Sequence, residues 1–395
     1  MSALWAIKSV RQNYTPSVEM LDLMEQFRRM VNDCIRIGLS ENVTSLKSLS
    51  LRAYKQLFSY DCPSYYKLCA ISASVGILRN HRKAKHENPH TNAPYARRSR
   101  LATCYGFKIE EGNVLLPLRG GRRASILLAR HTQNALSGHE PRSVTLTPTT
   151  LAIAYRKWVE EVKPLGALGI DRNLNNVTVA ASDGPTAQYD LSAATRWKST
   201  YRQVKSHFSR NDHRIRRRIF RKYGRKQHNR VDQILHHASR VIVADAMAKQ
   251  YGIVMEKLTG IRRLYRRGNG QGRNYRAKLN GWSYAELQRQ IEYKAKWEGI
   301  RIIYVPPRGT SAKCSTCGSR IIPEEGRTLK CLKCGVGMDR DVNAARNIMA
   351  AGVRGLRFGP DGAQGEAMVR EPKIAAIPIV DCAQLTRGVT HGPTS

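Results

Sequence analysis

Four cysteines make the most specific chemical pattern in the sequence. Cys314 and Cys317 form one C-x-x-C pair, and Cys331 and Cys334 form a second pair after thirteen intervening residues. Each pair can present two thiolates from a tight turn, which suits the glycine that follows each second cysteine, and two such turns complete a tetrahedral Zn²⁺ site. Four thiolates leave no open coordination position, so the pattern predicts a structural zinc. The alternative is four unrelated buried cysteines.

Three acidic residues form a second candidate site. Asp171 and Glu256 each end a short apolar run, and Asp341 opens the segment DVNAARNIM. Burying a carboxylate against apolar strands is costly unless a cation compensates its charge. Mg²⁺ favours oxygen ligands, and two such ions about 4 Å apart can clamp an in-line attack on a phosphodiester. The three acids are therefore candidate catalytic ligands of Mg²⁺, with two ions expected.

Each acid also has an ordinary structural explanation. A lone aspartate after a strand is usually a turn residue or a helix cap, and Asp339 or Asp341 could simply cap the last helix. The order along the chain separates the functional alternatives. Asp, Glu, Asp is the order of RuvC-type nucleases, whereas integrase-like transposases have Asp, Asp, Glu.

The hydrophobic pattern predicts an α/β frame around these residues. Residues 165–191 predict three consecutive strands with Asp171 on the first, which is the meander of an RNase H-like fold. A long basic helical region is expected over 192–250, a short buried strand over 253–258 and a helix over 282–299. The segment DVNAARNIMAAG predicts a closing helix.

The first 160 residues predict a helical module inserted into a small β-barrel. Residues 3–11 are typical of a strand, and 16–90 carry apolar residues at helical steps. Strand patterns then return, with one hairpin around Glu111–Gly112–Asn113 and a second pair of strands over 143–161.

Positive charge is the third signal. Lys and Arg total 67 against 30 Asp and Glu, which gives a net charge of +37. Such a chain repels itself unless a polyanion neutralises it. Nucleic acid is the expected partner, and a membrane surface is the main rival.

Two basic runs flank Glu256. Residues 201–230 hold twelve Lys or Arg and one acid, and 257–278 hold eight and no acid. We predict that both runs line a nucleic-acid channel, the alternative being a solvated basic face. The candidate nucleic-acid-binding residues are Arg216, Arg217, Arg218, Lys222, Arg262, Arg263, Tyr265 and Arg266.

The sequence shows no sign of a membrane or secreted protein. It contains no run of about 18 apolar residues, and its start, MSALWAIKSV, has no apolar signal core. We therefore expect a cytoplasmic protein without a membrane partner. Its length suggests two or three domains, and a monomer is favoured.

The ordered motifs resemble a known family. GIDRNLNN, IVMEKL, WSYAELQRQIEYKAKWEG, PPRGTSAKCSTCG and CLKCGVGMDRDVNAARNI follow one another as in TnpB, the transposon-encoded relative of the type V CRISPR nucleases. The resemblance covers about 165–350 and implies a nucleoid-associated protein of a prokaryote. It implies that Asp171, Glu256 and Asp341 are the metal-binding catalytic acids. Asp341 matches better than Asp339 because it directly precedes Val-Asn-Ala-Ala. Asn173 departs from the family, which often has a small residue there.

The resemblance also implies a fold class and a domain layout. The fold would be an α/β RuvC/RNase H-like nuclease domain with a zinc-ribbon insert, preceded by a wedge β-barrel that carries a helical recognition module. The expected domains are the first wedge strand (1–15), the recognition module (16–92), the rest of the wedge (93–160), the nuclease (161–310 and 339–352), the zinc ribbon (311–338) and a disordered tail (353–395).

The implied activity is RNA-guided cleavage of double-stranded DNA. A guide RNA, from the transposon end or CRISPR-like, would select the target beside a short DNA motif, and one RuvC-like, Mg²⁺-dependent site would cut it. Base pairing then reads the sequence, which accounts for so many backbone-directed charges. Two alternatives stay open. One is a guide-directed repressor that does not cut, and the other is a DNA-strand-transferring transposase. The intact acids and their order favour the nuclease.

Overall fold

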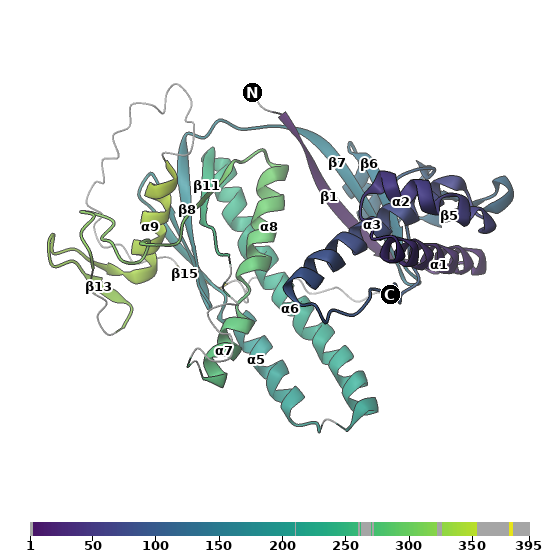
Figure 1. Ribbon diagram of the computed structural model, residues 1–395. Helices are drawn as coiled ribbons and strands as arrows, with labels where there is room; N and C mark the ends of the chain where they lie inside the picture. Colours follow the sequence, from purple (N-terminus) through teal and green to yellow (C-terminus); the bar gives the residue numbers. More distant parts are fainter. Residues whose placement is uncertain are drawn as a thin grey trace, which may run out of the picture. The chain divides into compact units, whose positions relative to one another are not determined.

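The computed structural model describes two compact units. The described residues are 3–209, 211–259, 261, 270, 272–321, 326–353 and 379–381. One unit holds Trp5–Trp158, and the other holds Val159 onward together with the first four residues (Figure 1). In the described part of the chain, no helix is both long and apolar enough to cross a membrane.

The second unit is built on a mixed sheet. Strands β8 (Gly166–Arg172), β9 (Asn176–Ala181) and β10 (Thr186–Asp190) form an antiparallel meander. Strand β11 (Tyr251–Glu256) pairs parallel with β8, and β12 (Ile302–Val305) pairs parallel with β11. The predicted meander with the first acid on its first strand is therefore present, and two parallel strands extend it on the β8 side.

A sixth strand lies at the far edge of this sheet. Strand β15 (Ile379–Asp381) pairs parallel with β10. It falls within the segment 353–395, for which the sequence predicted a disordered tail. The structure differs from that prediction at these three residues, because the edge of β10 offers free backbone groups for pairing.

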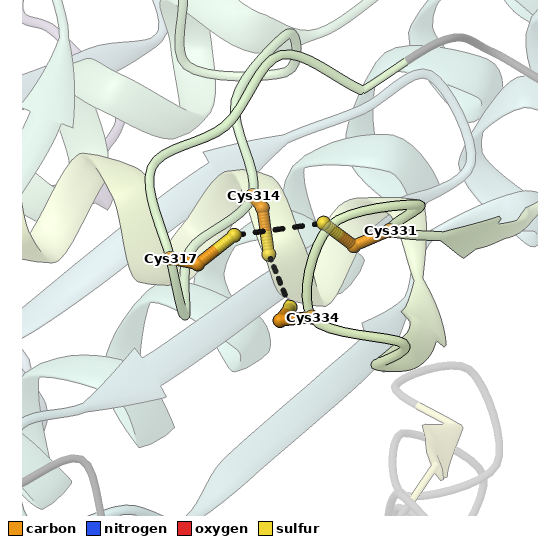
Figure 2. A group of neighbouring side chains, drawn as sticks. All are labelled: Cys314, Cys317, Cys331 and Cys334. Carbon is orange, nitrogen blue, oxygen red and sulfur yellow. Dashed lines mark hydrogen bonds between the residues drawn. The ribbon is translucent and has the colours of Figure 1, made fainter.

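A small insert separates β12 from the last helix. Its two short strands, β13 (Thr328–Lys330) and β14 (Gly337–Asp339), pair antiparallel. One C-x-x-C turn precedes β13 and the other connects the two strands, so that four cysteine side chains converge (Figure 2). The chain then enters helix α9 (Arg340–Val353) directly after β14.

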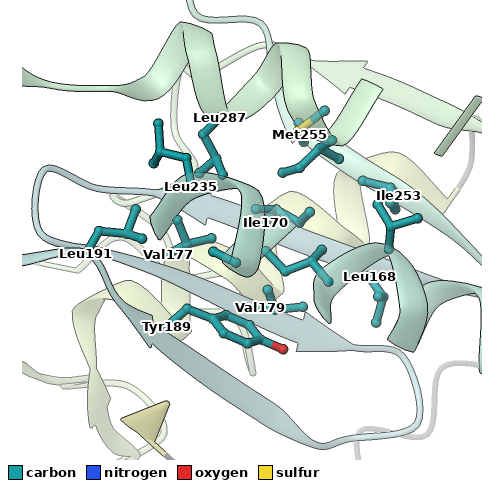
Figure 3. Close-up of a cluster of buried hydrophobic side chains, with 14 of the residues drawn as sticks. Leu168, Ile170, Val177, Val179, Tyr189, Leu191, Leu235, Ile253, Met255 and Leu287 are labelled. Atoms are coloured by element: carbon teal, nitrogen blue, oxygen red, sulfur yellow. The ribbon is translucent and has the colours of Figure 1, made fainter. Parts of the chain in front are cut away.

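Helices cover both faces of the sheet, because β8 and β9 are buried along their whole length. On one face, Leu168 and Ile170 pack against Leu235 of α6 (His213–Ala248) and Leu287 of α8 (Tyr284–Trp297) (Figure 3). On the other face, Ala167 and Val254 pack against Ile348 of α9. Since side chains alternate along a strand, residues 167, 169 and 171 of β8 share the α9 face, as do 254 and 256 of β11.

Glycines allow α9 to lie directly on the sheet. A Cβ atom at Gly169 would come 2.3 Å from the Ala345 carbonyl oxygen and 2.5 Å from Met349 Cβ. A Cβ atom at Gly352 would come 2.2 Å from a methyl group of Val254. The absence of side chains at these two points sets the height of α9 above β8 and β11.

Helix α6 extends beyond the core. Its buried residues begin at Val231 and continue to Ala246, whereas its first half has none. That half pairs with α5 (Ser192–Ser206), and Gly224 allows the Tyr201 hydroxyl to approach closely. The predicted basic helical region is therefore a hairpin of two helices with an exposed basic arm. Helix α7 (Arg273–Gly281) follows β11 along the chain.

The first unit places a helical segment between two strands of one sheet. Helices α1 (Val18–Ser40), α2 (Leu46–Ala53) and α3 (Ser64–Glu87), with the 3₁₀ turn Lys55–Ser59, lie in the chain between β1 (Ala3–Asn13) and β2 (Leu101–Thr103). The sheet has the order β1-β7-β6-β2, with β6 at Glu140–Leu146 and β7 at Thr150–Glu160. The predicted helices and the second strand pair are present.

The strands predicted for the β-barrel divide into two sheets in the described residues. Strands β3 (Lys108–Glu110), β4 (Asn113–Pro117) and β5 (Arg123–Leu127) make a separate three-stranded sheet, followed by α4 (Arg130–Leu136). The tight turn at Glu111 and Gly112, both with positive φ, makes the pairing of this sheet local. Its strands therefore pair with one another instead of closing the first sheet.

Gly169→Ala should destabilise the second unit by about 2 kcal/mol or more, because the new methyl group meets a helix carbonyl that cannot rotate away. Gly281→Ala is the matched control, since a Cβ atom there has nothing within 4 Å. It should be neutral or slightly stabilising. Urea unfolding followed by tryptophan fluorescence measures both. Equal midpoints for the two variants would contradict the close approach of α9.

Candidate active site and metal centre

Two of the predicted acids end neighbouring strands. Met255 of β11 is in register with Ile170 of β8. Glu256, the last residue of β11, and Asp171, the last but one of β8, therefore lie at the same end of the two parallel strands. Both belong to the positions that face α9. The sequence alone placed each acid at a strand end, and the register brings the two ends together.

The third acid enters this face from α9. Asp341 lies in the first turn of α9 and is 7% exposed. Asp339 accepts hydrogen bonds from the backbone N–H groups of Asp341 (2.8 Å) and Val342 (3.2 Å). Asp339 is therefore the cap of the helix, and the carboxylate of Asp341 is not used for capping.

Two asparagine amides connect the first and third acids. Asn173 donates to Asp171 (2.9 Å) and to the side-chain oxygen of Asn176 (3.1 Å). Asn176 donates in turn to Asp341 (3.2 Å). Asn173 is the residue that departs from the family pattern, and in the structure its amide orients the first acid. No sequence signal pointed to Asn176, which a strand-end position alone does not distinguish.

A threonine from the loop after β12 holds the second acid. The Thr310 hydroxyl lies 2.6 Å from Oε1 of Glu256, and Thr310 is buried. Asn347 of α9 donates to the carbonyl oxygens of Thr310 (2.8 Å) and Lys313 (2.7 Å), and Asn343 also donates to the latter (2.8 Å). Asn343 and Asn347 lie one turn apart on α9, and this spacing is the sequence feature that could have indicated these contacts.

The electrostatics of the cluster favour a bound cation. Burial raises the pKa of Asp171 to about 6; the hydrogen bond from Asn173 opposes that shift, and the nearby Glu256 adds to it. Asp341 is also buried. Arg327 of the insert contacts Asp341, and its Nε lies 3.8 Å from Asp339. Carboxylates from three segments, of which those of Asp171 and Asp341 are buried, offer the oxygen ligands that Mg²⁺ prefers.

Arg172 fixes the two strand ends from the opposite face. Its side chain is 2% exposed and donates to the main-chain oxygen of Glu256 (2.5 Å) and to Gln288 of α8 (2.5 Å). A buried guanidinium that bonds the next strand in this way holds β8 and β11 in register at the acids. No role was predicted for Arg172, because a lone arginine after an acid is an unspecific signal.

The four cysteines form one cluster. Their sulfur atoms all lie within 4.8 Å of one another, with Cys314 to Cys334 at 3.7 Å and Cys317 to Cys331 at 3.5 Å (Figure 2). These separations exclude disulfide bonds, whose sulfurs are about 2 Å apart. They match the edge of a tetrahedron with Zn–S bonds of about 2.3 Å, which is about 3.8 Å. The cluster can therefore hold a zinc ion.

The turns that carry the cysteines repeat one backbone pattern. The N–H of Gly318 donates to the carbonyl of Cys314 (2.9 Å), and the N–H of Gly335 donates to that of Cys331 (2.9 Å). Both glycines have positive φ, 73° and 72°, which other residues rarely adopt. The glycine after each pair is thus required by the turn, as the sequence indicated.

The candidate nucleic-acid-binding residues divide into three groups. Arg217, Arg218 and Lys222 lie on the exposed arm of α6, where they line an open hollow of about 710 Å³. The other residues that line it are Arg214, Arg221, Arg225 and Lys226. Arg216 instead stacks on Phe220 (5.1 Å) and donates to the Ser209 carbonyl (3.0 Å). The remaining candidates, Arg262, Arg263, Tyr265 and Arg266, lie outside the described residues.

Comparison with known proteins identifies related sequences and a similar fold. Residues 284–348 match the family described as Cas12f1-like, TNB domain. A TnpB-like protein of Methanocaldococcus jannaschii is 30% identical over 215 residues, which cover 52% of this chain and 76% of that protein. A protein of Escherichia coli K12 named as the putative RNA-guided DNA endonuclease InsQ is 38% identical over 114 residues, 26% of this chain and 27% of that protein.

Among solved structures, a Cas12f1–sgRNA–target DNA complex contains a similar chain. The TM-score is 0.56 at 15% identity, over 84% of this chain and 83% of that chain. At this identity the likeness concerns the fold. The family match spans α8, β12, all four cysteines and Asp341.

Asp171→Asn should stabilise the magnesium-free protein at pH 7.5. The pKa of Asp171 is about 6 in the folded chain and about 3.9 in an unfolded one. The stabilisation by its proton is present below about pH 4 and is lost as the pH rises through about 6. Because the amide is neutral at every pH, Asp171→Asn avoids this loss. Its free energy of unfolding should be higher than that of the wild type by on the order of 3 kcal/mol at pH 7.5.

Thermal unfolding at pH 7.5 and pH 4 measures this effect. The gain of Asp171→Asn should be large at the higher pH and near zero at the lower one. Asp245→Asn, an exposed control on α6 with a 3.8 Å contact to Lys249, should change little at either pH. A gain that does not depend on pH would contradict the burial of an ionised Asp171.

The zinc site predicts one tightly bound zinc per chain. Cys331→Ser should abolish it and expose the insert to proteolysis, because structural zinc contributes on the order of 10 kcal/mol to local folding. Cys104→Ser is the control, since Cys104 is exposed and lies in the other unit. Elemental analysis of protein purified without chelator measures the zinc. Full zinc content in Cys331→Ser would refute the assignment.

Proposed function

Because the chain belongs to the TnpB family, we propose that it is an RNA-guided endonuclease that cuts double-stranded DNA at one metal-dependent active site. The observation that carries the proposal is the meeting of three acids from distant parts of the chain. Asp171, Glu256 and Asp341 come from two strand ends and one helix start, and they share the α9 face of one sheet. Neither capping nor turn formation accounts for all three.

In this proposal the nuclease domain has a RuvC-like fold with a zinc ribbon inserted before the third acid. The meander, the parallel β11 and the order Asp, Glu, Asp support it. The first unit would supply the wedge and recognition modules, which read a short DNA motif. The guide would be an RNA from the transposon end or a CRISPR-like RNA.

The residues of the site would position the metal ligands. Asp171, Glu256 and Asp341 would hold Mg²⁺, with two ions expected. When bound, Mg²⁺ would supply the positive charge that activates water and stabilises the charge developing on the phosphodiester. Asn173 and Asn176 orient two of the carboxylates through their amides, and the Thr310 hydroxyl orients that of Glu256. The hydrogen bonds of Arg172 hold the strand ends that carry the first two acids.

The zinc ribbon would act on the active site indirectly. Its first turn is bonded to α9, because the N–H of Ser315 donates to the Asn343 side chain (2.8 Å). Arg327, between the two cysteine pairs, contacts Asp341. A folded insert therefore keeps a positive charge at the acid cluster and fixes the start of the helix that carries the third acid.

Cleavage is the direct test of the acid assignment. Protein purified with its co-expressed native locus RNA is incubated with Mg²⁺ and a DNA target that matches the guide. Asp171→Asn, Glu256→Gln and Asp341→Asn should each lower the cleavage rate by on the order of 100-fold or more. Binding of RNA and target should stay nearly unchanged, since phosphate contacts elsewhere supply affinity.

Asp339→Asn is the matched control for Asp341→Asn. Asparagine caps a helix as well as aspartate does, so this variant should still cut. If Asp339→Asn abolishes cleavage and Asp341→Asn does not, the third acid is misassigned. Guide-directed binding by the wild type without any cleavage would instead identify a repressor, and joining of DNA strands would identify a transposase.

The basic arm of α6 predicts a salt-dependent effect. Arg217→Gln with Arg221→Gln should weaken binding to matched and mismatched nucleic acid alike, because phosphate contacts carry no base information. The slope of log affinity against log salt should fall by about 0.7 to 0.9 for each phosphate that is no longer neutralised. Arg289→Gln with Lys296→Gln, on α8, is a control of equal charge. The same slope for both double variants would mean that the arm is only a solvated face.

A further inference from the structure

Two tryptophans lie exposed on one sheet of the first unit. Trp5 of β1 is 40% exposed and Trp158 of β7 is 55% exposed. Their rings meet edge to face, with centroids 5.0 Å apart and an angle of 75°. Two exposed rings in contact offer a wider flat apolar surface than a single exposed side chain does.

Strand alternation shows which face of the sheet they occupy. Ala6 of β1 and Ile153 and Tyr155 of β7 are buried and point into the core of the unit. Trp5 and Trp158 differ from them by an odd number of positions, so they point to the opposite face. Both lie within Trp5–Trp158, so the pair belongs to a single unit.

Small side chains lie on this face of β7 and β6. On β7, Ala152 and Ala154 share the face of Trp158 and are half-buried. They pair in register with Thr145 and Ser143 of β6. Small side chains at these positions of β6 and β7 leave room beside the Trp158 ring for a flat ligand.

A fixed positive charge completes the surface. The guanidinium of Arg156 lies over the Trp5 ring, 4.1 Å from its centroid, and is bonded to Glu140 at 2.5 Å. These contacts restrict the arginine to one orientation. The chain as a whole carries +37.

We propose that Trp5, Arg156 and Trp158 form a stacking site for an unpaired nucleobase of bound RNA. Aromatic rings beside a guanidinium bind the face of a base of any identity, and positive charge near them attracts the adjacent phosphate. A lipid or apolar protein partner would not need the anchored arginine. The inference rests on the proposed function only for RNA as the partner, since it concerns a surface remote in sequence from the acids.

Stacking and phosphate contacts leave different signatures. Stacking of a base on tryptophan releases no counterions. Removal of the tryptophan should therefore reduce affinity while leaving the slope of log affinity against log salt unchanged. Substitutions in the basic arm of α6 should instead reduce that slope. The two surfaces can therefore be separated in one set of titrations.

The test uses the full-length protein and two probes, a single-stranded oligouridine and a blunt RNA duplex of the same length. Trp158→Ala should bind the single strand about 10-fold more weakly or worse, bind the duplex normally and keep the wild-type salt slope. Trp158→Phe should retain most of the affinity. Tyr105→Ala is the control, because Tyr105 is a 58% exposed aromatic residue of the same unit and should have no effect. Tryptophan fluorescence should be quenched by the single strand in the wild type.

Three results would overturn the stacking site. One is an equal loss for duplex and single strand, and another is an equal effect of Tyr105→Ala. The third is a lowered melting temperature of Trp158→Ala with unchanged RNA affinity, which would make the pair a packing feature. In the last two cases the wild type still binds RNA and the proposed function stands. If the wild type binds neither RNA probe nor its locus RNA, the proposed function fails with it.

Discussion

Helix α9 lies against β8 and β11 at a distance that only glycine permits, at Gly169 on the strand and Gly352 on the helix. This contact decides where the helix begins. Because the start of α9 lies over the ends of two parallel strands, Asp341 joins the face of Asp171 and Glu256. The candidate site therefore depends on a packing distance as much as on the acids, and a methyl group at either glycine would separate the ligands.

The surrounding polar residues hold a cluster that would otherwise repel itself. Burial raises the pKa of Asp171, with Glu256 adding to the shift, so the carboxylates are poorly suited to lie together without a cation. Amides of Asn173 and Asn176 and the Thr310 hydroxyl direct hydrogen-bond donors at them. The zinc-binding insert is tied to the same helix. Its folding and the geometry of the acids are coupled through α9.

Sequence patterns predicted the features that depend on local chemistry. C-x-x-C spacing and the glycine after each pair determine the cysteine cluster, and apolar runs ending in an acid locate two of the candidate ligands. The roles of Arg172 and Thr310 could not be predicted, because each depends on contacts between segments far apart in the chain. The division of the predicted barrel strands into two sheets was missed for a related reason. Strand patterns identify strands, but the pairing of β3–β5 with one another follows from their short turns, at Glu111–Gly112 above all.

The central claim is that the three acids form one metal site. Anomalous scattering from crystals soaked in Mn²⁺, a substitute for Mg²⁺ with the same preference for oxygen ligands, tests it directly. Manganese peaks should lie between the carboxylates of Asp171, Glu256 and Asp341, and they should disappear in crystals of Asp341→Asn. Peaks that persist in that variant, or manganese bound only elsewhere on the protein, would contradict the account.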